Sequence, residues 1–210
     1  MNKKDLRNLF EDSLGGILGK LQIDDLLEDY LEIEEKWICF FKKIDSINLV
    51  IIAEAPLNSK QYILNKNAKD SIFLYKRTLE KCIDVYKENP VKNELTKIDL
   101  MRELGIIVIE AYPFALDPKK HKNNYENLDP ETKKHLFKTS YPWHLKKKLE
   151  IMKSKTTPNT VFSYRYDRNK DFIDFIDADI NFIYIGDAGK GRKSYGATDE
   201  DKLVNIFSVV

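Results

Sequence analysis

Residues 46–56 read Ser46-Ile47-Asn48-Leu49-Val50-Ile51-Ile52-Ala53-Glu54-Ala55-Pro56, an aliphatic run that stops at a carboxylate and a proline. The uninterrupted aliphatic stretch at 49–52 is typical of a strand that is buried on both faces of a parallel sheet. Pro56 has no N–H to donate, so the strand must end before it. Glu54 is therefore predicted at the carboxyl end of the strand, where open α/β sheets bind their ligands.

The same pattern recurs later in the chain and predicts the fold. An aliphatic run at 106–109 is followed by a glutamate, an alanine and soon a proline, and shorter apolar runs occupy 160–165 and 180–185. Helical periodicity fills the intervals at 70–88, 93–104, 129–139, 143–152 and 171–176, and a closing helix is predicted at 199–206. Residues 3–43 are also helical in pattern, with a break at the glycines of 15–19.

Strands that alternate with helices indicate βαβ units. We therefore expect an α/β fold, a three-layer α/β/α sandwich with a four-stranded, mainly parallel sheet and a helical N-terminal extension. The 210 residues are predicted to form one domain, in which the segment 1–45 packs on a core of 46–210.

Composition narrows the class of protein. Hydrophobic residues make up 42% and charged residues 33%, as in a globular protein. The 35 Lys and Arg residues nearly balance the 34 Asp and Glu residues, so a nucleic-acid site must be a local patch. Cys39 and Cys82 lack metal spacing and are predicted to be buried thiols. With no apolar run of about 18 residues and no signal-like N-terminus, we expect a cytoplasmic protein without a membrane partner.

Three carboxylates are predicted at strand ends along one edge of the sheet: Glu54, Glu110 and Asp187. Converging carboxylates position water, accept protons or bind metal ions, and Glu54 and Asp187 are the predicted catalytic residues. The alternative is that each marks only the exit of the chain from the core. The acidic region 24–35 is interpreted as a solvated helix face. The histidines show no metal-ligand spacing, so no metal or cofactor is predicted, and His144 beside Trp143 is expected to be structural.

Aromatic and basic residues near the same edge suggest a ligand. Tyr112, Phe114 and Tyr62 are candidate platforms for a base, with Glu110 beside them, although aromatic residues are more often part of a core. The Gly-rich loop at 186–193 follows the last strand and is a candidate phosphate site or a plain basic loop. The predicted phosphate-binding residues are Arg165, Lys190, Arg192 and Lys193.

The segment Val50-Ile51-Ile52-Ala53-Glu54-Ala55-Pro56 resembles the first motif of the uracil-DNA glycosylase superfamily, an apolar strand followed by Gly-Glu-Ala-Pro-Gly. Ala53 replaces the first glycine and Leu57 the last. The resemblance implies that Glu54 orients the hydrolytic water and that Pro56 shapes a loop that pinches a DNA phosphate. The family usually carries His-Pro-Ser after its fourth strand, where this chain has Gly186-Asp187-Ala188-Gly189 and no histidine to stabilise the departing base.

These observations predict a uracil-DNA glycosylase-like protein that acts on or binds nucleic acid bases, with hydrolytic base release. Two alternatives remain open at this point. One is a non-catalytic nucleic-acid or nucleotide-binding protein on the same fold. The other is a small-molecule hydrolase or transferase that uses the strand-end carboxylates, with a metal ion held by Glu54, Glu110 and Asp187.

Overall fold

The computed structural model describes residues 3–68, 74–87, 95–117, 125, 127–165, 173, 175–176, 180–186 and 198–210. Its centre is a four-stranded sheet with the order β2-β1-β3-β4, and every pairing is parallel. The strands are β1 (Ile47–Ala53), β2 (Ile106–Glu110), β3 (Thr156–Tyr164) and β4 (Phe182–Tyr184). The predicted α/β fold with four parallel strands is confirmed.

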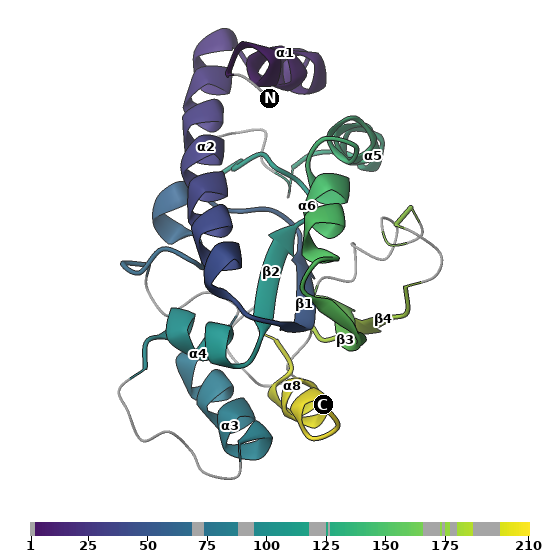
Figure 1. Cartoon of the computed structure of the whole chain (residues 1–210). Helices are drawn as coiled ribbons and strands as arrows, with labels where there is room; N and C mark the ends of the chain where they lie inside the picture. The colour runs from purple at the N-terminus through teal and green to yellow at the C-terminus, as the bar shows by residue number, and fades with distance from the viewer. Residues whose placement is uncertain are drawn as a thin grey trace.

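Helices cover the sheet in two groups, with the strands between them (Figure 1). One group contains α1 (Lys3–Leu14), α2 (Lys20–Lys43), α5 (Pro130–Ser140) and α6 (Leu145–Met152). The other contains α3 (Lys76–Tyr86), α4 (Lys97–Glu103) and α8 (Glu200–Phe207), and a single 3-10 turn, η1 (Ser59–Gln61), follows β1. One hydrophobic cluster includes side chains of α1 and α2 together with those of the strands. α1 packs against α2 and α5, and Trp37 of α2 reaches β2 at Val108.

Several helix ends follow local sequence signals. The Asp129 side chain accepts a bond from the Thr132 amide at 2.9 Å, and Pro130 begins α5, as predicted. Gly105 follows α4 with a φ of 66°, and a side chain there would approach the Ser46 carbonyl oxygen at 2.7 Å. Glycine is therefore required where the chain turns tightly from α4 into β2.

Four sequence predictions need correction. The helix predicted at 93–104 begins at Lys97, because Thr96 is extended and caps it. The helix predicted from residue 70 begins at Lys76, because Leu74 is buried and Tyr75 is extended ahead of it. β3 begins at Thr156 rather than 160, because the turn-forming sequence Thr157-Pro158-Asn159 lies within a register shift of the strand instead of before it. Cys82 is buried as predicted, but Cys39 is exposed, because Trp37 and Phe40 take the inward positions of α2.

The outer side of β2 is closed by side chains from two helices. The Ala111 amide donates to the Ala53 carbonyl on β1. The odd-numbered residues of β2 therefore bond to β1, and the carbonyls of its even-numbered residues point away from β1. The Trp37 indole N–H donates to the Val108 carbonyl at 3.1 Å. His144 Nε2 lies 3.0 Å from the Glu110 carbonyl, which can only accept, so Nε2 donates. Thus α2 and the residue before α6 satisfy two outward carbonyls of this strand, and His144 is structural, as predicted.

Candidate functional site

The strand order reverses between β1 and β3, and the carboxyl ends of these two strands mark the position at which open α/β sheets form a ligand crevice. From β1 the chain passes to β2 on one side, and after β2 it crosses to β3 on the other side of β1. Open α/β sheets bind ligands at such a reversal, outside the carboxyl ends of the strands. Glu54 follows β1 and Arg165 follows β3, and both side chains are partly exposed. The Arg165 amide donates to the Ile52 carbonyl at 3.2 Å, which fixes the two strand ends side by side.

The loop that carries Glu54 and Pro56 is held by its neighbours. Asn58 donates from Nδ2 to Asp117 Oδ2 at 2.9 Å, a bond between two buried side chains that joins this loop to the one after β2. The Asn58 Oδ1 atom also accepts from the Gln61 amide at 2.9 Å and so caps η1. Pro56 is itself buried. The hydrogen bonds of Asn58 therefore order the candidate catalytic loop before any ligand binds.

Glu110 does not join Glu54 in this crevice. Ala53 pairs with Glu110, and successive residues of a strand point to opposite faces, so Glu54 and Glu110 leave the sheet in opposite directions. Glu110 is 3% exposed, and its Oε2 lies 3.8 Å from Lys148 Nζ. The same ammonium group lies 2.5 Å from Glu34 Oε1. The predicted meeting of the strand-end carboxylates is thus not seen for this pair.

The electrostatics of Glu110 follow from its burial. Desolvation raises the pKa of Glu110 to about 7, Lys148 opposes this rise, and the Glu34 charge adds to it. Glu34 lies in the acidic region interpreted as solvated, and this interpretation was wrong for its carboxylate. Sequence reasoning missed Glu34 and Lys148 as partners. A signal existed for Lys148, which falls in the apolar stripe of Leu145, Leu149 and Met152.

The predicted base-stacking residues are covered by other aromatic rings. Tyr112 and Phe114 are both 0% exposed. The Tyr112 ring centre lies 4.7 Å from that of Tyr125, and the Phe114 ring centre lies 5.0 Å from that of Phe10. Tyr62 is also buried. Their role in substrate binding stays a prediction, and it requires an opening of this aromatic cluster.

A better exposed aromatic pair lies at the ends of β3 and β4. The rings of Tyr164 and Tyr184 are partly exposed, and their centres lie 5.1 Å apart. Tyr164 directly precedes Arg165, so an aromatic residue and a cation follow one another at the end of β3, and the alternation of a strand directs them to opposite faces of the sheet. The alternation of aromatic and basic residues in Tyr164-Arg165-Tyr166 is a sequence signal for the first member of this pair.

Gly186 links the ends of β3 and β4. A Cβ at this position would lie 1.9 Å from the Arg165 carbonyl oxygen, so only glycine fits. Four predicted site residues follow it in the chain: Asp187, Lys190, Arg192 and Lys193. These four lie outside the described residues, and their catalytic and phosphate-binding roles stay predictions.

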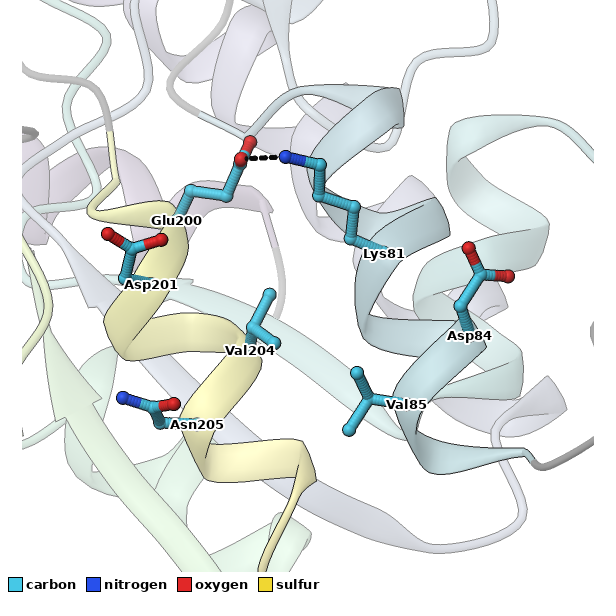
Figure 2. Close-up of a pocket in the computed structure, with 7 residues that line it drawn as sticks. All are labelled: Lys81, Asp84, Val85, Glu200, Asp201, Val204 and Asn205. Atoms are coloured by element: carbon cyan, nitrogen blue, oxygen red, sulfur yellow. Dashed lines mark hydrogen bonds and ion pairs between the residues drawn. The ribbon is translucent and has the colours of Figure 1, made fainter.

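A separate pocket of about 470 Å³ lies between α3 and α8 (Figure 2). Lys81 pairs there with the buried Glu200, whose Oε2 also accepts from Thr78 Oγ1 at 3.0 Å. The Glu200 carboxylate is thus used to join the two helices. All lining residues come from these helices, so this pocket contains no strand-end residue and none of the predicted site residues.

Neither a metal-binding cluster nor a membrane-spanning helix is present in the described part of the chain. It contains no group of three or more His, Cys, Asp or Glu side chains placed to hold a metal ion. Within the same ranges, no helix is both long and apolar enough to cross a bilayer. Comparisons with protein-family models, curated proteins and solved structures find no significant match to this chain.

Proposed function

We propose that this protein is a glycosylase-like hydrolase that binds a nucleic acid base at the crevice between β1 and β3. The observation that carries the proposal is the partly exposed Glu54 carboxylate, held on an ordered loop directly after the central strand. The resemblance of residues 50–56 to the first glycosylase motif supports the same role. The parallel four-stranded layout is the one that this resemblance implies.

The reaction requires a general base that activates water, and the departing nucleobase must be able to leave as a neutral molecule. Glu54 accepts a proton from a water molecule as the water oxygen attacks the anomeric carbon of the sugar. The N-glycosidic bond breaks, and the base leaves with the bonding electrons and takes a proton from solvent. Arg165 neutralises a neighbouring phosphate, and the Tyr164 ring offers a stacking surface for the extruded base.

A base-release assay tests this proposal. Labelled single- and double-stranded oligonucleotides carrying uracil, hypoxanthine or oxidised bases are incubated with the protein, and abasic sites are revealed by alkaline cleavage. Glu54→Gln keeps the size of the side chain but cannot act as a general base, so we expect the rate of base release to fall by at least about 100-fold. Glu35→Gln, at an exposed glutamate of α2, is the matched control and should retain full activity.

The outcomes separate the candidate functions. Full activity in Glu54→Gln would remove Glu54 from the mechanism. Oligonucleotide binding that weakens steeply with salt, without base release, would favour the non-catalytic binding protein instead. If the protein neither binds these oligonucleotides nor releases a base from them, the proposal is wrong.

A further inference from the structure

A group of polar side chains lies inside the protein where α2, the loop after β1, β2 and α6 meet. It consists of Glu34, Tyr62, Glu110, His144 and Lys148, and we call it the interior polar cluster. Tyr62, Glu110, His144 and Lys148 are each at most 3% exposed. Lys148 Nζ also lies 4.9 Å from the centre of the Trp37 ring, which covers the cluster from α2.

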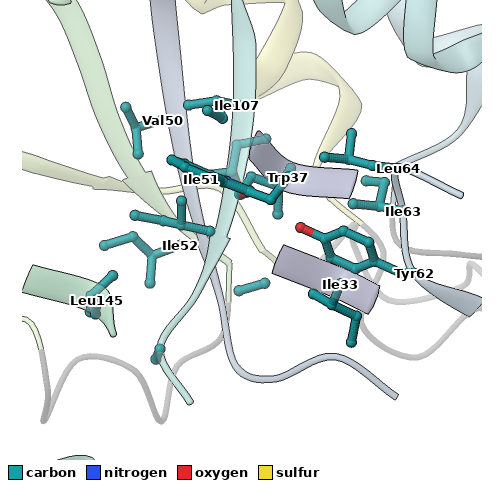
Figure 3. Packing of buried hydrophobic residues seen from close by; sticks show 14 of the residues in the cluster. Ile33, Trp37, Val50, Ile51, Ile52, Tyr62, Ile63, Leu64, Ile107 and Leu145 are labelled. Atoms are coloured by element: carbon teal, nitrogen blue, oxygen red, sulfur yellow. The ribbon is translucent and has the colours of Figure 1, made fainter. Parts of the chain in front are cut away.

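Several polar atoms of this cluster have no hydrogen-bond partner within the described protein. They are Tyr62 Oη, Glu110 Oε2 and His144 Nδ1, together with Glu34 Oε1 and Lys148 Nζ, which form an ion pair with each other. Tyr62 points its hydroxyl inward, toward Trp37 (Figure 3). The Lys148 ammonium lies 3.8 Å from Glu110 Oε2, which is too far for a direct hydrogen bond.

The proton positions on His144 follow from its one hydrogen bond. Nε2 donates to the Glu110 carbonyl, so in the neutral ring Nδ1 carries a lone pair. Burial, with the nearby Lys148 charge, lowers the pKa of His144 well below its usual value, so the ring stays neutral. His144 Nδ1 is therefore a buried acceptor.

A buried polar atom without a partner costs about 1–3 kcal/mol, which is why such atoms are almost always paired with protein or with ordered water. The cluster offers two kinds of donor, the Tyr62 hydroxyl and the Lys148 N–H groups. It offers three acceptors, Glu34 Oε1, Glu110 Oε2 and His144 Nδ1. A water molecule accepts two hydrogen bonds and donates two, so the unpaired groups have the complementary chemistry.

We propose that the interior polar cluster is an internal hydration site, in which Tyr62 Oη, Glu110 Oε2 and Lys148 Nζ hold one water molecule or a short water chain that extends toward His144 Nδ1. The water joins the loop after β1, β2 and α6, whereas α2 is already joined to α6 by the direct contact between Glu34 and Lys148. The site is distinct from the crevice between β1 and β3 and does not depend on the function proposed for it.

A crystal structure of the whole chain at about 1.8 Å or better tests the site directly, because ordered waters are visible there. We expect a water within hydrogen-bond distance of Tyr62 Oη and of Glu110 Oε2 or Lys148 Nζ. Direct bonding of the Tyr62 hydroxyl to a protein group, with no water density in the cluster, would overturn the proposal.

Matched tyrosine variants give a second test in solution. Tyr125 is buried like Tyr62, but its hydroxyl donates directly to the Phe114 carbonyl at 3.0 Å. Tyr62→Phe and Tyr125→Phe each remove one oxygen and leave the ring in place. Magnetic relaxation dispersion of oxygen-17 water counts long-lived internal waters. We expect the count to fall in Tyr62→Phe and to stay unchanged in Tyr125→Phe, and an equal count in the two variants contradicts the proposal.

Discussion

The carboxyl ends of β1 and β2 have the same sequence pattern but different surroundings. In each, an aliphatic run is followed by a glutamate, an alanine and a nearby proline. Glu54 is partly exposed at the reversal of strand order, whereas Glu110 is buried against Lys148. The difference comes from α2 and α6, which pack over the end of β2. A carboxylate at a strand end is thus a candidate ligand-binding group only where no helix covers it.

The largest effect is expected from removing the cation that Glu110 depends on. Lys148→Met should destabilise the protein by about 3–5 kcal/mol, because it leaves a carboxylate buried without its partner. The free energy of unfolding from urea titrations measures this loss. Lys147→Met, at the exposed neighbouring lysine, should change it by less than about 0.5 kcal/mol. Equal effects of the two substitutions would mean that Lys148 is solvated rather than paired.

Glu110→Gln should change how stability depends on pH. The pKa of Glu110 is raised from 4.5 to about 7, so between these values the folded chain keeps a proton that the unfolded chain loses. Wild-type stability therefore decreases with rising pH over this window through Glu110. His144, whose pKa is lowered, acts in the opposite direction below about pH 6.5.

The glutamine side chain of this variant mimics the protonated acid. The substitution therefore removes the pH dependence of stability that comes from Glu110 and leaves the one that comes from His144. Relative to wild type, Glu110→Gln should be near neutral below pH 4.5 and gain stability toward pH 7, by at most about 3 kcal/mol. Unfolding titrations at several pH values measure the difference between the two proteins. A difference that does not change with pH would show that Glu110 titrates like an exposed glutamate.

A smaller effect is expected at Asn58, which links the loop after β1 to the loop after β2. Asn58→Ala removes the bond to Asp117 and the cap of η1, which should cost about 1–3 kcal/mol. It should also lower base release, because the loop that carries Glu54 is no longer fixed. Thermal denaturation and the base-release assay measure the two effects. Asn67→Ala, at an exposed asparagine in the same loop, is the control and should leave both unchanged.

The smallest effect on folding is expected at Glu54 itself. Because its side chain is partly exposed, Glu54→Gln should change the free energy of unfolding by less than about 1 kcal/mol, in contrast to the large loss of base release expected for the same substitution. Urea titrations of Glu54→Gln and Glu110→Gln at pH 7 give the direct contrast between the two strand ends. A large loss of stability in Glu54→Gln would mean that the Glu54 side chain contributes to the core, as that of Glu110 does.

The strands and most helix ends could be predicted from the sequence because their signals are local. The aliphatic runs at 47–53 and 106–109 are long enough to indicate buried strands, and Asp129-Pro130 and Gly105 mark helix ends chemically. The start of α3 was misplaced because Leu74 is apolar at a helix-like spacing but is buried as an extended residue. Helical periodicity does not separate these two cases.

The candidate site was less predictable because its chemistry depends on which helix lies over which strand end. Glu54 could be placed from the sequence, since its position needs only the strand and Pro56. The burial of Glu110 depends on α2 and α6, which lie far from it in the sequence. The covering of Tyr112 by Tyr125 and of Phe114 by Phe10 is likewise a tertiary contact that no local pattern encodes.

The hydrogen bonds from Trp37 and His144 to the outer carbonyls of β2 have a consequence for association between molecules. An exposed strand edge is a template on which a second chain can add a strand and begin to aggregate. Two bulky rings from the helices occupy this edge and use its acceptors at Val108 and Glu110. α2 and the residue before α6 thereby protect the sheet against intermolecular growth on this side, and a shortened chain without residues 1–43 would lose the part that Trp37 supplies.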